Sequence, residues 1–258
     1  MLRSRIIPTL LIKGSDLVKT INFSKSIYLG DPLNTVKIFN EKKVDELVIL
    51  DIDATSKNKE PNYALLEKIA SVSRMPLAYG GGVKNIEQFQ RIIRLGVEKV
   101  VISNSFIRNK NLIKQCAYQF GSQSVVVCLD IKLKGIFKKR YKVCLNNGKD
   151  IIREDFVDLA KSAEEFGAGE LIINSIDREG TYSGFDLEVI DEIINNINIP
   201  ITLVGGASSH EDIKSLFSKY KIIGAGVGSL FVFKGKYKAV LIQYPTIEER
   251  LLIQDQIN

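Results

Sequence analysis

The chain carries the same sequence pattern twice, and the two copies are separated by a constant distance. Residues 46–106 align with residues 170–230 without a gap, so that every position has a counterpart 124 residues later. Each copy begins with a glutamate followed by three aliphatic residues. The landmarks that match are Glu46 and Glu170, Asp53 and Asp177, Pro76 and Pro200, Gly81–Gly82 and Gly205–Gly206, and Ser105 and Ser229. A repeat of this length predicts a fold built from two equivalent halves.

Short aliphatic runs alternate with amphipathic segments along most of the chain. Runs that are apolar almost throughout are typical of parallel strands covered by helices. Strands are predicted near residues 5–12, 46–52, 76–80, 98–103, 124–131, 170–175, 200–204 and 221–226. Helices are predicted near residues 32–42, 62–72, 86–95, 109–119, 153–166, 186–196 and 209–218. In a chain of 258 residues with a half-repeat, this alternation predicts a single α/β domain, a (β/α)₈ TIM barrel with half-barrels of about 1–120 and 121–258.

The last part of the chain is less regular than the rest. Residues 237–242 alternate between polar and apolar side chains, as a strand does. After Pro245, the spacing of Thr246 and Glu249 is that of a capping box, which predicts a short terminal helix.

The composition excludes several classes of protein. Hydrophobic residues make up 45% and charged residues 26% of the chain, as in an ordinary globular protein. No apolar run approaches the roughly 18 residues of a membrane-spanning helix, and the N-terminus lacks a signal-peptide pattern. The three cysteines, Cys116, Cys128 and Cys144, indicate free thiols in a reducing compartment. We therefore expect a cytoplasmic protein without a membrane anchor, and no metal or nucleotide cofactor is indicated by any motif.

The net charge of +6 raises the question of a nucleic-acid partner. The densest basic segment, residues 132–142, alternates with apolar residues around Gly135 and is typical of a solvated hairpin. No nucleic-acid-binding motif accompanies it, so no nucleic-acid partner is expected. A phosphorylated small substrate would account for part of the positive charge.

Small residues follow four of the predicted strands, at the end of a barrel where active sites lie. Gly81–Gly82 follow the third strand and Gly205–Gly206 the seventh, and such glycines let backbone amides approach a phosphate. The residues that follow the fourth and eighth strands are Ser103, Asn104, Ser105, Gly228 and Ser229, at helix starts that favour an anion. The two loop pairs predict two phosphate sites on one extended substrate. The alternative is that the glycines only form tight turns.

Asp130 lies at the end of an otherwise apolar strand, where a carboxylate is costly without a function or a partner. This position predicts a general acid or base. The alternative is a salt bridge to a nearby lysine. The matching position in the first half is Leu11, which cannot transfer a proton.

Asp53 and Asp177 follow the second and sixth predicted strands. Either carboxylate could bind hydroxyl groups of a substrate, or it could hold its own loop by accepting hydrogen bonds from backbone amides. The sequence leaves both interpretations open, although we include Asp177 among the candidate substrate-binding residues.

Seven motifs spread over residues 1–233 together resemble the HisF family, the cyclase subunit of imidazole glycerol phosphate synthase. They are Arg5-Ile6-Ile7-Pro8, Gly30-Asp31-Pro32, Asp45-Glu46-Leu47, Gly80-Gly81-Gly82, Phe120-Gly121-Ser122-Gln123, Gly167-Ala168-Gly169-Glu170 and Asp177-Arg178-Glu179-Gly180-Thr181. The resemblance weakens over the last 25 residues, where the family closes with an eighth helix.

The resemblance implies a partner and a path for ammonia. In this family a glutaminase subunit, HisH, releases ammonia that travels through the barrel to a bisphosphorylated substrate. The charged residues of the family's ammonia gate match Arg5, Glu46, Lys99 and Glu170. The resemblance also implies that Lys19, on a flexible loop after the first strand, binds substrate together with Gly82 and Ser229.

Departures from the family concern the other end of the barrel. The two catalytic aspartates of the family fall on Leu11 and Asp130, and its Thr, Ser and His positions fall on Asp53, Val204 and Val232. Residues 8–13 and 231–236 are similar to a HisF-like branch associated with amidation of surface-polysaccharide sugars. Those proteins are thought to act with a HisH-like glutaminase and a separate sugar amidotransferase.

Three functions therefore remain open. The favoured one is a lyase-type, glutamine-dependent synthase subunit that delivers ammonia for sugar amidation in lipopolysaccharide biosynthesis. The second is the true cyclase of histidine biosynthesis, which converts PRFAR and ammonia to imidazole glycerol phosphate and AICAR. The third is a catalytically silent barrel that only activates its glutaminase partner.

Overall fold

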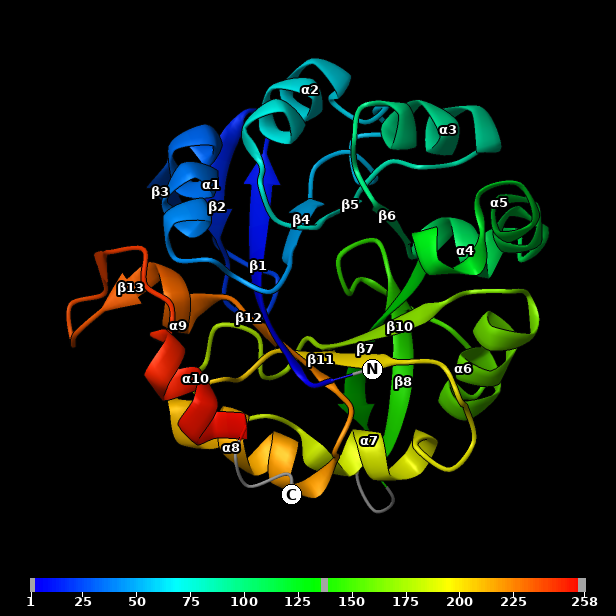
Figure 1. Cartoon of the computed structure of the whole chain (residues 1–258). Coiled ribbons are helices and arrows are strands. Elements are labelled where there is room, and N and C mark those ends of the chain that lie inside the picture. The colour runs from blue at the N-terminus through cyan, green and yellow to red at the C-terminus, as the bar shows by residue number, and fades with distance from the viewer. Residues whose placement is uncertain (1–2, 136–138, 255–258) are drawn as a thin grey trace.

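The structure, a computed structural model, describes residues 3–135 and 139–254. Its parallel strands close into a ring (Figure 1), because each strand pairs with the next and the last pairs with the first. Around the ring, the strands are β1 (Arg5–Lys13), β4 (Leu47–Asp51), β5 (Leu77–Gly80), β6 (Lys99–Ile102), β7 (Val125–Lys134), β10 (Glu170–Ser175), β11 (Ile201–Val204) and β12 (Gly224–Val227). The predicted (β/α)₈ barrel is confirmed, and each half of the sequence repeat supplies four neighbouring strands.

Helices cover the outside of the ring, and most of them follow one another in chain order (Figure 1). Their bounds are α1 (Pro32–Glu41), α2 (Tyr63–Val72), α3 (Ile86–Arg94), α4 (Asn104–Arg108), α5 (Asn111–Phe120), α6 (Phe156–Glu165), α7 (Leu187–Ile193), α8 (His210–Lys219), α9 (Ser229–Val232) and α10 (Ile247–Gln254), with a 3₁₀ turn at Ser122–Ser124. Helix α10 packs against α8 and lies between α8 and α1 (Figure 1), so it completes the outer ring.

Local sequence signals explain where several helices begin. Asn85 accepts a hydrogen bond from the Gln88 amide at 2.9 Å and caps α3. Before α10, the Glu249 amide donates to the Thr246 hydroxyl and the Thr246 amide donates to the Glu249 carboxylate. These contacts satisfy free amides of the first turn. The predicted capping box and terminal helix are confirmed.

Side chains that point into the barrel form a buried cluster separate from the core between strands and helices. Its members are Ile7, Val48, Ala78, Val101, Val126, Cys128, Ile172 and Val204. Inward and outward residues alternate along each strand, so this cluster occupies the middle of the barrel interior. Polar side chains are thus confined to its two ends, where the candidate functional groups lie.

The segment after β1 differs from the sequence-based expectation. It forms two antiparallel strands, β2 (Asp16–Lys19) and β3 (Ile27–Gly30), which extend the barrel sheet from β1. Lys19 therefore ends a strand and is buried, with 6% of its surface exposed, rather than lying on a flexible loop. The backbone pairing and the buried Leu17 and Val18 explain why this segment is ordered.

The basic segment forms the expected hairpin, in which β8 (Arg140–Leu145) pairs with the end of β7 and β9 (Asp150–Ile151) extends it. Residues 136–138 of the basic segment lie outside the described residues. The strand predicted at 237–242 is mostly wrong. Only Ala239–Val240 form a strand, β14, which pairs with β13 (Phe233–Lys234).

The described part of the chain contains no helix with the length and apolar character needed to cross a membrane. All three cysteines are buried free thiols.

Candidate active site at the barrel mouth and charged ring at the opposite end

Four charged side chains meet at the N-terminal end of the barrel, as the family resemblance implies. Arg5 donates to the carboxylates of Glu46 at 2.5 Å and Glu170 at 2.8 Å. Lys99 donates to the same two carboxylates, each at 2.8 Å. Each cation therefore bridges both anions, and the four form a closed ring that we call the charged ring.

The charged ring is largely withdrawn from water. The side chains of Glu46 and Glu170 are only 5% and 7% exposed. Burial opposes ionisation of Glu170, but attraction to Arg5 and Lys99 outweighs it and holds the pKa of Glu170 below its ordinary value. The Thr202 hydroxyl adds a hydrogen bond of 2.6 Å to Glu170. A buried pair of this kind requires both partners, because removal of one leaves an uncompensated charge.

At the C-terminal mouth, two cavities lie side by side, one beside each glycine loop pair. The first-half cavity has a volume of about 220 Å³ and includes Gly81, Gly82, Ser103, Asn104 and Ser105 in its wall. The second-half cavity has a volume of about 30 Å³ and includes Gly205, Gly206, Gly228 and Ser229. Both cavities contact Leu11, Phe23, Leu50 and Asn174. The structure thus brings the predicted loop residues to one mouth, in two groups.

Asp130 lies in the wall of the first-half cavity, together with Cys128. Its carboxylate accepts a hydrogen bond from the Asn174 amide at 2.9 Å and contacts the Cys128 thiol at 3.9 Å. None of the described lysines forms an ion pair with it, so the alternative of a salt bridge is not supported. Burial raises the pKa of Asp130 to about 6, against the opposing effect of these hydrogen bonds. The group is therefore suited to exchange a proton near neutral pH.

The mouth is chemically asymmetric. Asp130 and Asn174 are paired in register on β7 and β10 and form its polar side. Leu11 and Leu50 are paired in register on β1 and β4 and form its apolar side. Because Leu11 is only 6% exposed, it occupies the wall rather than lying outside it. The end of β7 therefore offers a carboxylate that can exchange a proton, whereas the matching end of β1 offers only a hydrocarbon side chain.

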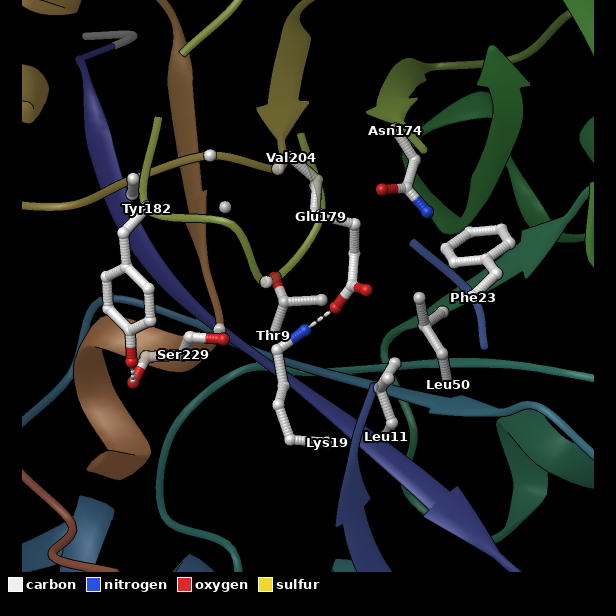
Figure 2. Close-up of a pocket in the computed structure, with 16 residues that line it drawn as sticks. Thr9, Leu11, Lys19, Phe23, Leu50, Asn174, Glu179, Tyr182, Val204 and Ser229 are labelled. Atoms are coloured by element: carbon white, nitrogen blue, oxygen red, sulfur yellow. Dashed lines mark hydrogen bonds and ion pairs between the residues drawn. The ribbon is translucent and has the colours of Figure 1, made fainter. Parts of the chain in front are cut away.

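Figure 2 shows the second-half cavity, where Lys19 and Glu179 point toward one another and form an ion pair. Burial lowers the pKa of Lys19 to about 7, while the adjacent Glu179 carboxylate favours the charged ammonium. On the other side of the cavity, the Tyr182 hydroxyl donates to the Ser229 carbonyl at 3.1 Å. The lysine that the resemblance implies for substrate binding is thus present, but it is already paired.

The remaining candidates have separate roles. Asp177 is not part of either cavity wall, and its carboxylate accepts the Leu133 amide at 2.8 Å, which matches the alternative of a loop tie. Asp53 contacts the first-half cavity and forms an ion pair with Lys57. Ser105 donates to the Val83 carbonyl at 2.5 Å and so joins α4 to the glycine loop.

Sequence reasoning missed three residues of the site: Asn174, Glu179 and Tyr182. Asn174 is the repeat counterpart of Leu50, so a polar residue at that strand end was a usable signal. Glu179 lies inside a motif that was already singled out. No sequence feature indicated Tyr182, which has a positive φ of 59°.

Glycine is required in the loop after β11 for a structural reason, in line with the alternative that such glycines only form tight turns. Gly205 and Gly206 have φ values of +104° and +100°, where a side chain is strained. A Cβ at Gly205 would lie 2.7 Å from the Ser175 carbonyl oxygen. A Cβ at Gly206 would collide with the carbonyl oxygen of Gly184. The glycines therefore serve close packing of adjacent loops, whether or not they also approach a ligand.

Gly206→Ala is expected to lower the free energy of unfolding by about 3 kcal/mol, because strain and steric overlap add. Gly14→Ala is the matched control, since Gly14 has a φ of +67° and nothing within 4 Å of an added Cβ. It should lower stability by only about 1 kcal/mol. Urea unfolding of both variants measures the difference, and equal losses would show that overlap with Gly184 is relieved at no cost.

Comparisons with known proteins agree with the geometry. The sequence pattern of a family described as "Histidine biosynthesis protein" matches residues 5–238. A Leptospira borgpetersenii protein named "Putative imidazole glycerol phosphate synthase subunit HisF" is 52% identical over 245 residues, covering 95% of this chain and 96% of that protein. The chain belongs to the HisF family of histidine biosynthesis proteins.

Other relatives of this HisF-family chain differ in how they are named. "Putative imidazole glycerol phosphate synthase subunit hisF3" of Vibrio vulnificus is 49% identical over 250 residues, covering 97% of this chain and 96% of that protein. "Imidazole glycerol phosphate synthase subunit HisF" of Lactococcus lactis subsp. lactis is 39% identical over 231 residues, covering 90% and 89%. The chain is thus similar to synthase subunits over nearly its whole length.

Proposed function

We propose that the chain is the barrel subunit of a glutamine-dependent synthase that delivers ammonia for amidation of a sugar in surface-polysaccharide biosynthesis. A HisH-like glutaminase would dock at the N-terminal face and release ammonia at the charged ring. Ammonia would then cross the apolar interior to the C-terminal mouth, where a phosphorylated substrate binds. A separate sugar amidotransferase is the expected consumer of the delivered nitrogen.

One observation carries this proposal: the charged ring is complete, while the mouth has a carboxylate, Asp130, at the end of β7 but a leucine, Leu11, at the matching end of β1. The ring is assembled from side chains of β1, β6 and β10 and of the residue before β4, and it holds two buried carboxylates. Since packed hydrophobic residues in place of such a cluster are often equally stable, a function at this end explains the ring better than stability does. At the mouth, Leu11 faces the cavity where a second proton-transferring group would be required for cyclisation. The ammonia end is therefore retained and the cyclisation end is altered.

A second candidate is the imidazole glycerol phosphate synthase reaction itself. The 39% identity to the Lactococcus lactis HisF subunit favours it, as does the presence of both glycine loops at the mouth. In that case Asp130 would act without a second aspartate.

Reconstitution with the HisH-like glutaminase of the same organism tests the two candidates. Glutamine hydrolysis is measured with and without the chain, and PRFAR conversion is measured with glutamine or with ammonium. We expect strong stimulation of the glutaminase and PRFAR turnover far below that of the Lactococcus lactis subunit. Equal PRFAR turnover would favour the cyclase, and the absence of stimulation would reject both. Stimulation that yields no aminated product, even with the sugar amidotransferase present, would indicate a silent scaffold.

Leu11→Asp is expected to raise PRFAR conversion by at least about tenfold, because it restores a second proton-transferring group. Ammonium-dependent product formation is the measurement. Leu50→Asp is the matched control, since Leu50 is the register neighbour of Leu11 on β4 and lines the same cavities. If both variants gain activity equally, the position of the carboxylate does not matter and the argument from Leu11 fails.

A further inference from the structure

Lys19 and Glu179 form a buried ion pair in the wall of the second-half cavity (Figure 2). Lys19 is the one basic residue, and Glu179 the one acidic residue, among the described residues of that wall. Their side chains are 8% and 5% exposed. The ammonium that would attract an anion is therefore already neutralised by the protein.

The position of Lys19 connects it to the glycine loop of the same cavity. A Cβ at Gly228 would lie 3.1 Å from the Lys19 Nζ atom, so a side chain at this position would crowd the ammonium. Lys19 is thus held against the loop that ends in Ser229, at the place where a phosphate would need a counter-ion. The cavity, at about 30 Å³, holds no more than a few water molecules in this form.

Glu179 also holds the segment that carries Lys19. The Thr20 hydroxyl donates to its second carboxylate oxygen at 3.0 Å, and the Asn22 amide donates to its carbonyl at 2.9 Å. Asn22 and Phe23 have positive φ values of 51° and 58°, which are unfavourable for residues with side chains. Contacts to residue 179 therefore help to hold this segment, together with its pairing to β1 and a hydrogen bond from the Asn22 side chain to the Asp177 carbonyl.

We propose that Glu179 competes with the substrate for Lys19, so that an anionic group of the phosphate-monoester class binds only by taking Lys19 from Glu179. A dianion can compensate for the lost ion pair, whereas a weak monoanion cannot. Glu179 is thus a specificity-determining residue of the cavity. The inference rests on the phosphate-binding part of the proposed function and not on ammonia delivery.

Glu179→Gln tests the proposal, because it removes the competing charge and keeps the shape and the acceptor for Thr20. The probe is inorganic phosphate, titrated into the isolated chain, with the backbone amide signals of Gly206 and Gly228 as local reporters. Phosphate affinity at these reporters should rise by about tenfold, the effect of roughly one charge-assisted hydrogen bond. Unchanged or weaker binding would overturn the proposal and make Glu179 a residue that positions Lys19.

Three controls separate this effect from others. The amides of Gly82 and Ser105 report the first-half cavity, and their titration should not change. Asp53→Asn makes the same carboxylate-to-amide change in the Lys57 ion pair of that cavity and should leave Gly206 and Gly228 unaffected. Glu179→Asp retains a shorter carboxylate and should raise affinity by less. If Glu179→Gln fails to fold, Glu179→Asp still tests the proposal. Phosphate binding equal to or weaker than that of the unaltered chain would contradict competition between Glu179 and phosphate for Lys19.

Neither ammonia nor the glutaminase partner takes part in this titration. If the phosphate titration contradicts competition at Lys19, the proposal of ammonia delivery is unaffected. If the chain does not stimulate the glutaminase, the result of the phosphate titration remains valid.

Discussion

Asp130→Asn is expected to reduce ammonium-dependent product formation at the mouth by a factor of about 10² to 10⁴, the usual contribution of a general acid or base. PRFAR is the test substrate, because even weak conversion by the unaltered chain provides a rate to compare. The substitution preserves the shape of the side chain and its contact with Asn174. Asp53→Asn alters another carboxylate of the same cavity and is expected to change the rate by only a few-fold.

The pH dependence of the rate tests whether Asp130 is the group that transfers the proton. Burial raises the pKa of Asp130 to about 6, so a rate that depends on the carboxylate as a base should rise as pH increases through about 6. The concentration of unprotonated ammonia is held constant, and the rise should be absent in Asp130→Asn. A rate that falls through the same range would instead show that the protonated form acts as an acid.

Stability provides an independent control on this variant. Since the folded-state pKa of Asp130 lies above the unfolded value, ionisation of the buried carboxylate destabilises the fold as pH rises through about 6. The neutral asparagine avoids this, so the variant should be at least as resistant to urea at pH 8. A large loss of stability would mean that any loss of rate cannot be assigned to proton transfer.

Glu170→Ala is expected to lower the free energy of unfolding by about 3 kcal/mol, because Arg5 and Lys99 are then left with one carboxylate between them. Urea unfolding at pH 7 measures the loss. Asp191→Ala, which breaks a surface pair with Lys219, should have little effect by comparison. Similar losses in the two variants would show that the charged ring is no more than a set of surface ion pairs.

Low pH should remove the contribution of Glu170 to the free energy of unfolding. The pKa of this carboxylate is held below its ordinary value by Arg5 and Lys99, although burial opposes that shift. Its contribution is therefore present above the unfolded pKa and is lost as pH falls through the folded one. The difference in stability between Glu170→Ala and the unaltered chain should shrink in the acid range below the ordinary glutamate pKa.

The same variant separates the two sources of ammonia. If the charged ring admits ammonia from the glutaminase, Glu170→Ala should reduce glutamine-dependent product formation more than ammonium-dependent formation. Equal reduction of both would contradict a role of the ring in ammonia transfer and leave it a structural element.

Most barrel strands could be predicted from the sequence because their signal is local. A run such as Val125–Leu129 is apolar throughout and is followed by a polar residue, so the presence of a strand there follows from the local pattern. The hairpin of β2 and β3 was not predicted, since Asp16–Lys19 and Ile27–Gly30 are short and mixed in polarity. Their pairing with β1 depends on contacts that no local pattern records.

The candidate site was only partly predictable for a related reason. The glycine loops, Asp130 and the charged ring are read from residue type, spacing and family motifs. The hydrogen-bond partner of each polar group depends on the tertiary structure. Asp177, which follows β10, is an example, because its carboxylate accepts a hydrogen bond from the amide of Leu133 on β7.

The amino-acid sequence by itself determined the barrel, its two-fold repeat, the charged residues of one end and the glycine loops and Asp130 of the other, because these depend on periodicity and on motifs along the chain. Only the tertiary structure decided that the charged ring closes, that Leu11 faces Leu50 across β1 and β4, and that Lys19 is paired with Glu179. Buried polar groups must find partners, and those partners can lie far away along the chain, 165 residues for Arg5 and Glu170 and 238 for the Tyr244 hydroxyl and the Ile6 carbonyl. Which partner is within reach depends on the packed fold.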